Sequence, residues 1–259
     1  MEQARDVARI SYDEQTATAF KAVREVPRDG LTEWRDAVRR HLRPSRETTL
    51  VDIGAGTGTF SAAFSEWFGI SVLAVEPSAA MRAHIPRTPA IRVLEGSASA
   101  LPLPDDSADA AWLSLVVHHI PDLGAAAREI RRVLRAGAPV LVRGGISGTN
   151  YDGIELVRWF PETARLVDTF PSFEQTCEAF AAAGFRFDAL EEVRETYPTG
   201  LAGLLDQVDT LRRADTTMRS LTDDEFRRGQ ERLRRAARAA EVTAAAAARS
   251  NWLPLLVLR

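Results

Sequence analysis

The sequence has almost none of the residues from which disulfide frameworks and metal clusters are built. Cys177 is its one cysteine, so no disulfide within the chain and no cluster of thiolate ligands can form. The four histidines, whose spacing suggests no metal site, are His41, His84, His118 and His119. We therefore expect a fold held together by apolar packing and a chemistry that needs no bound metal.

Long apolar runs and a strong excess of one charge are also missing. No run approaches the roughly 18 apolar residues of a membrane span, and the segment from Met1 to Gln15 lacks the apolar core of a secretory signal. The net charge of −3 at pH 7 gives no general attraction to nucleic acid or to an anionic membrane. We therefore expect a cytoplasmic protein that acts on a small molecule, with neither nucleic acid nor a membrane as partner.

A glycine-rich turn between two short apolar runs is the most informative feature present. The runs are LVDI, followed by GAGTGTF, over residues 50–60 and SVLAVEP over residues 71–77. Together they predict one half of a nucleotide-binding strand–helix–strand unit, in which glycines let the backbone bend sharply and approach a ligand. Glu76 then stands near the position, about 20 residues on, of an acid that binds ribose hydroxyls. A dinucleotide site needs a further glycine where Thr59 stands, which argues against NAD or FAD.

The same turn resembles the Asp-x-Gly-x-Gly-x-Gly loop of class I S-adenosylmethionine-dependent methyltransferases, and the resemblance runs from about residue 10 to the end of the chain. It implies S-adenosyl-L-methionine as cofactor. The glycines and the following helix would face its methionine part, Asp52 its amino group and Glu76 its ribose, and the adjacent Pro77 is a further cofactor-binding candidate. The residues concerned are Asp52, Gly54, Gly56, Gly58, Glu76 and Pro77. The alternatives are a generic tight turn and, for Glu76, a solvated strand end.

A third motif, LEGSA over residues 94–98, resembles the family's Gly-Asp-Ala segment. In the family the acid holds the adenine amino group and the alanine amide meets the ring, which implies these roles for Ser97 and Ala98. Ser97 stands where aspartate is usual. Its hydroxyl accepts a hydrogen bond without charge assistance, so the adenine contact should be weaker or shared with a neighbour.

The fourth predicted strand ends at Ser114 and leads into a His118-His119-Ile-Pro121 turn. Ligands of open α/β sheets meet the carboxyl ends of the strands, so Ser114 to His119 should border cofactor and substrate. The turn resembles the family's small-molecule branch and lacks the Asn/Asp-Pro-Pro-Tyr pattern of nucleic-acid base methyltransferases. Either histidine has a suitable ordinary pKa for a general base. The alternative is a buried histidine that caps the turn or the next helix.

Two further groups of residues are candidates for the walls of the site. Tyr12 and Arg24 resemble part of a cap helix that many family members fold over the cofactor, where they would meet its carboxylate or the substrate. The alternative is an ordinary surface helix. Tyr151, Trp159 and Phe160 supply aromatic surface for an acceptor pocket. For Trp159 the alternative is core packing.

The alternation of strand and helix patterns predicts a parallel sheet in one α/β domain with a helical elaboration. Strands are expected at 49–53, 71–76, 91–95, 109–114, 139–143, 185–193 and 252–258, with helices at 58–68, 78–84, 122–135 and 172–183. The resemblance implies a Rossmann-like, mostly parallel seven-stranded sheet whose last strand is antiparallel, with helices on both faces. The expected parts are a helical cap (1–47), a cofactor-binding core (48–145), the remaining core with a substrate-side loop (146–199), a helical lid (200–248) and the final strand (249–259).

The resemblance implies transfer of a methyl group from a sulfonium to an oxygen, nitrogen or carbon nucleophile of a small molecule, without a metal. Two alternatives remain open. One is a different transfer from the same cofactor, such as aminopropyl transfer, which releases methylthioadenosine. The other is a cofactor-binding protein without turnover.

Overall fold

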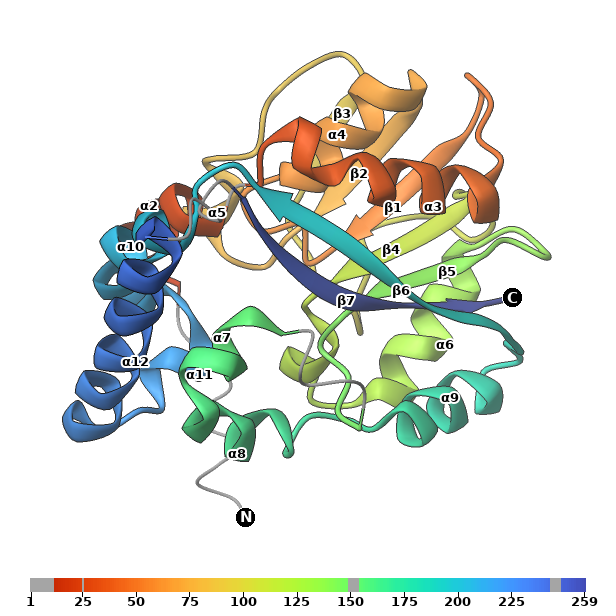
Figure 1. Ribbon diagram of the computed structural model, residues 1–259. Coiled ribbons are helices and arrows are strands. Elements are labelled where there is room, and N and C mark those ends of the chain that lie inside the picture. Colours follow the sequence, from red (N-terminus) through yellow and green to blue (C-terminus); the bar gives the residue numbers. More distant parts are fainter. Residues whose placement is uncertain (1–11, 25, 149–153, 243–247) are drawn as a thin grey trace.

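A seven-stranded sheet forms the centre of the computed structural model, which describes residues 12–24, 26–148, 154–242 and 248–259 (Figure 1). The strands are β1 (Thr49–Ile53), β2 (Ser71–Val75), β3 (Ile91–Leu94), β4 (Ala110–Ser114), β5 (Val140–Arg143), β6 (Phe187–Tyr197) and β7 (Arg249–Leu258). Their order is β3-β2-β1-β4-β5-β7-β6, and β7 runs antiparallel to both of its neighbours. The expected sheet, with its antiparallel last strand, is confirmed.

The order of the strands reverses between β1 and β4, which pair in parallel. In open sheets of this kind, a ligand site forms outside the carboxyl ends of the strands at such a reversal. Because β1, β4 and β5 are almost wholly buried, their near-continuous apolar sequences are those of strands covered on both faces.

Helices cover both faces of the sheet (Figure 1). On one face, α3 (Thr32–Leu42) and α4 (Thr59–Phe68) contribute Trp34 and Phe64 to a core that includes Trp112 of β4. On the other, α6 (Leu123–Val133) and α9 (Phe173–Ala182) pack Ile130 and Phe180 against the sheet. The α5 helix (Ala79–Arg82) follows β2, and short 3-10 helices lie at η1 (Arg28–Leu31), η2 (Val117–His119) and η4 (Pro161–Thr163).

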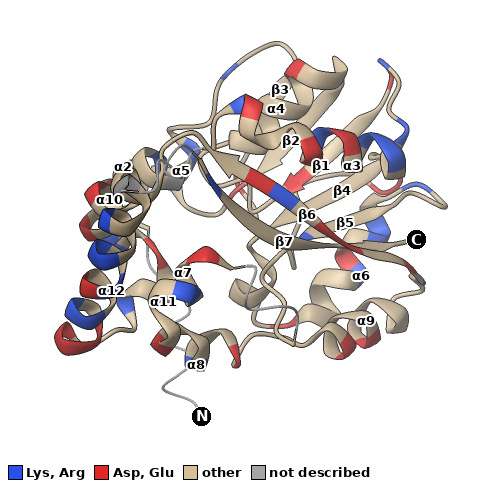
Figure 2. Ribbon diagram, viewed as in Figure 1, with Lys and Arg blue, Asp and Glu red and all other residues tan. Residues whose placement is uncertain are grey.

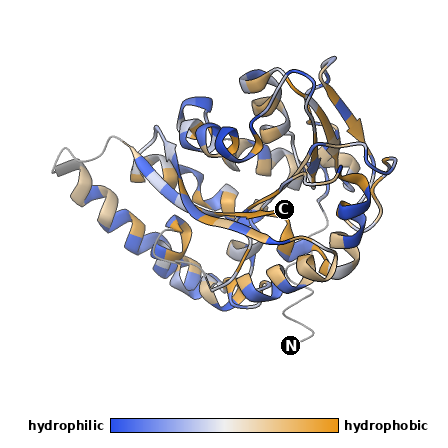
Figure 3. Ribbon diagram, turned by 90° about the vertical axis from the view of Figure 1, so that its right-hand side faces the viewer, coloured by the Kyte–Doolittle hydropathy of each residue, from blue (hydrophilic) through white to orange (hydrophobic). Residues whose placement is uncertain are grey.

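A third group of helices stands beside the carboxyl ends of the strands, on the left of Figure 1. It consists of α2 (Glu14–Arg24), α7 (Glu155–Trp159), α8 (Ala164–Val167), α10 (Leu201–Ala214), α11 (Thr216–Arg219) and α12 (Asp223–Val242). Val23 of α2 packs with Leu204 and Leu211 of α10 and Leu233 of α12 in one apolar cluster. Helices carry hydrophilic and hydrophobic residues together (Figure 3), and both signs of charge alternate along α12 (Figure 2). None of the described helices has the length and hydropathy needed to cross a membrane.

The structure changes several expected boundaries. The substrate-side loop expected after residue 146 contains α7, η4 and α8. The described part of the stretch 200–248 contains three helices, because Asp215 ends α10 and caps α11 by accepting hydrogen bonds from the backbone N–H groups of Thr217 and Met218. Among the described residues of the expected cap, 12–24 and 26–47, only α2 joins the third group. The other elements, η1 and α3, contact β6, and Trp34 of α3 is fully buried.

The last two strands are longer than expected, and the extra length matters for the site. Arg143 at the end of β5 pairs with Leu255, whereas β7 begins six residues earlier, at Arg249, beside Tyr197 of β6. The β6–β7 ribbon therefore continues past the end of β5. Charged residues interrupt the apolar pattern of this extension, which is why its periodicity did not predict a strand.

Candidate active site

Glu76 joins the glycine loop to the end of β2. Its Oε2 accepts a hydrogen bond from the backbone N–H of Gly56 at 2.9 Å, and its Oε1 accepts one from the N–H of Ser78, also at 2.9 Å. Burial raises the pKa of the carboxyl group, against the effect of these two N–H donors and of Arg82. Each oxygen keeps lone-pair capacity for a ligand hydroxyl. The expected ribose-binding acid is thus fixed in place beside the loop.

The three glycines of the loop have positive φ angles, as a side chain would rarely allow. A Cβ on Gly54 would lie 2.5 Å from Cγ2 of Val116, whereas the space beside Gly56 is open. Both residues line a cavity. Gly58 is not among the lining residues, and a Cβ there would lie 2.8 Å from Cγ2 of Ile85. The close approach at Gly58 is thus to the chain at Ile85, and its contact with the cofactor stays a prediction.

Asp52 lies one strand from Glu76 and is also buried at the cavity wall. It accepts a hydrogen bond of 2.5 Å from the Ser61 hydroxyl. Burial raises the pKa of Asp52 to about 7, the nearby Glu76 adds to the rise, and the hydrogen bond from Ser61 opposes it. Near neutral pH this carboxyl group is therefore poised between its charged and neutral forms.

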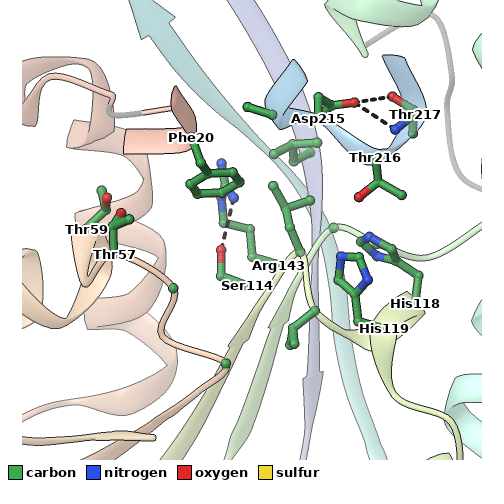
Figure 4. Close-up of a pocket in the computed structure, with 18 of the residues that line it drawn as sticks. Phe20, Thr57, Thr59, Ser114, His118, His119, Arg143, Asp215, Thr216 and Thr217 are labelled. Atoms are coloured by element: carbon green, nitrogen blue, oxygen red, sulfur yellow. Dashed lines mark hydrogen bonds between the residues drawn. The ribbon is translucent and has the colours of Figure 1, made fainter. Parts of the chain in front are cut away.

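The cavity that these acids border has a volume of about 890 Å³ and lies at the carboxyl ends of β1, β2, β4 and β5. Its wall is completed by the three segments expected to enclose an acceptor. The residues are Tyr12, Phe20 and Val23 of the N-terminal segment, Ile154–Val157, Val167 and Phe170 of the middle segment, and Leu204, Leu211 and Ala214 of α10. In Figure 4, Thr57 and Thr59 of the glycine loop lie across the cavity from the two histidines and Thr216.

His118 and His119 line this cavity on η2, directly after β4. The imidazole of His118 stacks on Phe170, with 4.0 Å between ring centroids and 13° between planes. His119 meets the ring of Tyr12 edge-on at 6.4 Å. The two histidines thus belong to an aromatic wall, and a general-base role for either stays a prediction.

Arg143, which the sequence reasoning missed, reaches from the end of β5 to Ser114 of β4 (Figure 4). Its Nη1 donates to the Ser114 hydroxyl at 3.0 Å, and its Nη2 forms an ion pair with Glu195 of β6. The guanidinium lies 5.1 Å from the ring centroids of both Trp34 and Phe60. Ser114 thus borders the cavity as expected, together with a buried cation.

Glu195 is held in its charged form by several donors. Burial acts to raise its pKa, but the charge of Arg143 and hydrogen bonds from Asn251 and Tyr197 outweigh burial and lower the pKa. The Asn251 Nδ2 and the Tyr197 hydroxyl each donate to Oε1 of Glu195 at 2.8 Å. This network is buried at the cavity wall on the extended part of the β6–β7 ribbon.

A second, largely buried ion pair, between Glu155 of α7 and Arg249 of β7, continues the network. The backbone N–H of Glu155 donates to Oδ1 of Asn251 at 3.0 Å, so Asn251 links the two pairs. Burial raises the pKa of Glu155, and Arg249 opposes the rise. The sequence could have predicted Arg143 as a site residue, because it ends an apolar strand as Ser114 does. It could not have predicted Arg249, which lay outside the predicted strand.

Other predicted residues lie away from the cavity or outside the described chain. Exposed Ser97 and half-buried Ala98 follow β3 in a short turn and do not line the cavity, whereas Pro77 does. Phe160 is fully buried and stacks on Phe226 of α12, which corrects its expected place on the acceptor wall. Half-buried Trp159 packs beside it. Tyr151 and the side chain of Arg24 lie outside the described residues.

Comparison with known proteins shows that the central part of the chain is similar to methyltransferases. A family model described as a methyltransferase domain matches residues 51–142. Demethylmenaquinone methyltransferase of Roseiflexus castenholzii is 34% identical over 111 residues, which cover 41% of this chain and 47% of that protein. The chain thus spans about half the length of the curated relatives it matches.

Solved structures extend the likeness to nearly the whole fold. A candidate methyltransferase from an antibiotic biosynthesis pathway of Anabaena variabilis has a TM-score of 0.70 at 22% identity, covering 91% of this chain and 98% of that chain. Geranyl diphosphate C-methyltransferase of Streptomyces coelicolor, solved with Mg²⁺, geranyl diphosphate and S-adenosyl-L-homocysteine, has a TM-score of 0.54 at 17% identity, covering 87% and 77%. At these identities the likeness concerns the fold.

Proposed function

Because residues 51–142 of this chain form a class I S-adenosylmethionine-dependent methyltransferase domain, we propose that the protein transfers a methyl group from S-adenosyl-L-methionine to a small molecule. The acceptor supplies an oxygen, nitrogen or carbon nucleophile. The observation that carries the proposal is the placement of Glu76, Asp52 and the glycine loop at one wall of a cavity of about 890 Å³. That volume lies within the range of small-molecule sites.

The residues present fit this cofactor. Glu76 has lone pairs for two ribose hydroxyls, and Asp52 offers a buried carboxylate to the cofactor's amino group. The open space beside Gly56 lets the cofactor approach the backbone. Ser97 and Ala98 stay our candidates for the adenine contact at the end of β3, and Tyr12 and Arg24 for contacts from the cap. The bound cofactor supplies a methyl group already activated by the sulfonium.

The protein's own task is then to orient the acceptor and to exclude water. Effective molarities of about 10⁵ M or more are available from orientation alone. The apolar residues of α2 and α10 roof the cavity, which suits a lid over a reaction protected from water. A base is needed only where the nucleophile arrives protonated, and His118 and His119 are the candidates. The net charge of −3 favours a small acceptor over a nucleic acid, and the location that we propose is the cytoplasm.

The test is incubation of the purified protein with labelled S-adenosyl-L-methionine and a metabolite extract. We expect S-adenosylhomocysteine as product and the label in the small-molecule fraction. We also expect calorimetry to show binding of the cofactor and of S-adenosylhomocysteine but not of NAD. Release of methylthioadenosine would favour the aminopropyl alternative, and binding without turnover in any extract would favour a non-catalytic cofactor-binding protein.

A further inference from the structure

The guanidinium of Arg143 has more hydrogen-bond donors than the surrounding side chains can accept. Arginine carries five N–H donors in a fixed planar geometry. The side chain is 6% exposed, and within the described part of the chain its hydrogen bonds go to Ser114 and Glu195 only. Its Nε is fully buried without an acceptor among the described residues, so the donors left for a ligand are the second N–H groups of Nη1 and Nη2, which no hydrogen bond uses. Unpartnered donors in a largely buried side chain are costly, so these N–H groups call for an oxygen that the described chain does not supply.

The neighbouring acceptors are already engaged. Glu195 accepts from Arg143, Asn251 and Tyr197, and Asn251 uses its own oxygen for the backbone N–H of Glu155. The Ser114 hydroxyl accepts from Arg143, which leaves its own O–H as one more donor at the cavity wall. At this point of the cavity, donors therefore outnumber acceptors.

The charges of the cavity wall select the kind of oxygen that fits. Arg143 and Arg249 are each paired with a buried carboxylate, Glu195 and Glu155. The same cavity is bordered by three further acids, Asp52, Glu76 and Asp215. Negative charge on a ligand would add to an acidic wall whose two cations are already compensated. An uncharged oxygen accepts from the surplus donors without that penalty.

We propose that the methyl acceptor carries a carbonyl oxygen that binds beside the hydrogen-bonded pair of Arg143 and Ser114 and accepts from both, and that Arg143 is a specificity-determining residue for such acceptors. The inference rests on the proposed function, because it concerns the acceptor's place in the same cavity. The ion pair with Glu195 and the rings of Trp34 and Phe60 fix the plane of the guanidinium. A guanidinium held in this way fixes the direction of a bound carbonyl group. It thereby orients the acceptor toward the cofactor side of the cavity, where Glu76 and the glycine loop lie.

The test uses three probes with one two-ring skeleton, which are 2-acetylnaphthalene, 2-naphthoate and 2-ethylnaphthalene. Their affinities for the full-length protein, saturated with S-adenosylhomocysteine, are measured by calorimetry. A buried site that hydrogen-bonds an oxygen discriminates strongly against an analogue without it, so the ketone should bind at least about tenfold more tightly than the hydrocarbon. The ketone should also bind more tightly than the carboxylate.

The double variant Arg143→Met/Glu195→Gln removes the donors together with their counter-charge, so that no uncompensated ion stays buried. The advantage of the ketone over the hydrocarbon should fall below about threefold. The matched control is Arg232→Met/Glu162→Gln, which removes another arginine–glutamate pair whose residues do not line the cavity, and it should keep the full advantage. If the double variant does not fold, Arg143→Lys replaces it in the test. This variant keeps a charge for Glu195 and should lose most of the ketone's advantage over the hydrocarbon.

Three results would overturn the inference. These are equal binding of the three probes, tightest binding of the carboxylate, or an unchanged ketone advantage in the folded Arg143 variants. Binding of S-adenosylhomocysteine separates the two levels of the proposal. A wild-type protein that does not bind it contradicts the proposed function, whereas normal binding without a ketone preference contradicts only the role of Arg143.

Discussion

Glu76 connects two parts of the site through its two carboxylate oxygens, which receive the backbone N–H groups of Gly56 and Ser78. Its place at the end of β2 therefore serves both the shape of the glycine loop and the proposed ribose contact. Hydrogen bonds to a charged group are worth about 1.5–3 kcal/mol each. Loss of the carboxylate should therefore lower the affinity for the cofactor.

We expect Glu76→Ala to weaken binding of S-adenosylhomocysteine at least about tenfold, measured by calorimetry, because two charge-assisted bonds are lost. Glu95→Ala is the control. Glu95 lies at the end of the next strand, is exposed and pairs with Arg82, so its loss should leave affinity within a few-fold. Wild-type affinity in the Glu76 variant would contradict the ribose assignment.

Asp52 should make cofactor binding depend on pH. Its pKa of about 7 means that it is mostly protonated at about pH 6, whereas the cofactor's ammonium group favours the carboxylate. At low pH, Asp52 must therefore lose its proton before it can bind the ammonium group. The affinity for the cofactor should fall about tenfold from pH 8 to pH 6. Calorimetry across this range measures the effect.

Two variants test the origin of this dependence. Asp52→Asn, which cannot ionise, should flatten the pH profile. Ser61→Ala removes the hydrogen bond that lowers the pKa of Asp52, so the midpoint should move to higher pH. A profile in Asp52→Asn like that of the wild type would assign the dependence to another group, with Glu76 the nearest candidate.

The raised pKa of Asp52 also has a consequence for the unliganded protein. The folded-state pKa of about 7 exceeds the ordinary pKa of an aspartate, 3.8, so between these values the folded state binds more protons than the unfolded state. The stabilising contribution is complete below about pH 4 and is lost as the pH rises through about 7. Glu76, whose pKa is also raised, acts in the same direction.

The histidines are tested by turnover rather than by binding. If one of them is the base, its replacement by glutamine should lower turnover at saturating acceptor and remove a limb of the pH–rate profile, while cofactor affinity holds. His118→Gln and His119→Gln are compared because the two side chains have different surroundings. His118 stacks on Phe170, whereas His119 meets the ring of Tyr12 edge-on. Full turnover with an unchanged profile in both variants would leave them only a packing role.

At the scale of elements, α12 does not line the cavity but fixes the segment behind it. A Cβ on Gly229 of α12 would lie 2.0 Å from Cδ1 of Phe160, whose ring is fully buried. The helix therefore packs on the ring at a distance that only glycine permits. Phe160 in turn follows α7, which brings Glu155 to the cavity.

Gly229→Ala sets two effects of opposite sign against each other. Alanine favours the helix by about 1 kcal/mol, whereas forcing an atom into a filled core costs about 1–3 kcal/mol. Because the clash is with a buried ring, we expect a net loss of about 1 kcal/mol or more in the free energy of unfolding. Denaturant unfolding at equilibrium measures it.

A double variant supplies the control for this packing. Phe160→Leu makes room for the new methyl group, so Gly229→Ala should be far less destabilising in that background, and the two effects should not add. Stabilisation by Gly229→Ala alone, at the level of helix propensity, would show that the helix can move away from the ring.

At the scale of the whole molecule, the roof over the cavity is made of segments far apart in the sequence. Helices α2 and α10 pack on each other and both line the cavity, whose floor comes from the sheet. A ligand bound there would contact both the sheet and these helices. Binding should therefore stabilise the packing of α2 on α10 through mass action.

We expect S-adenosylhomocysteine to slow amide hydrogen exchange in the loop over residues 54–58 and also in α2 and α10, because the roof must stay closed over the ligand. Helix α9, on the far part of the sheet, should change little, and NAD should change nothing. Protection of the loop without protection of α2 and α10 would mean that the cofactor binds beneath a roof that does not respond to it.

The sequence by itself determined the centre of the sheet and the cofactor side of the site. The strands β1, β2, β4 and β5 are short apolar runs, and the turn after β1 requires glycine at fixed positions. These are local signals, because burial on both faces and a positive φ angle each restrict which residues can stand there. Asp52, Glu76 and Ser114 followed from them, since a parallel sheet brings the carboxyl ends of its strands together.

Only the tertiary structure decided the acceptor side. Arg143, Glu195, Asn251 and Arg249 meet because β7 inserts between β5 and β6 and the ribbon continues past the end of β5. The distinction between Phe160 in the packing and Phe170 at the cavity likewise depends on where α12 lies. Charge pairing and side-chain packing between segments far apart in the sequence leave no period or spacing in either segment, so they exist only once the chain has folded.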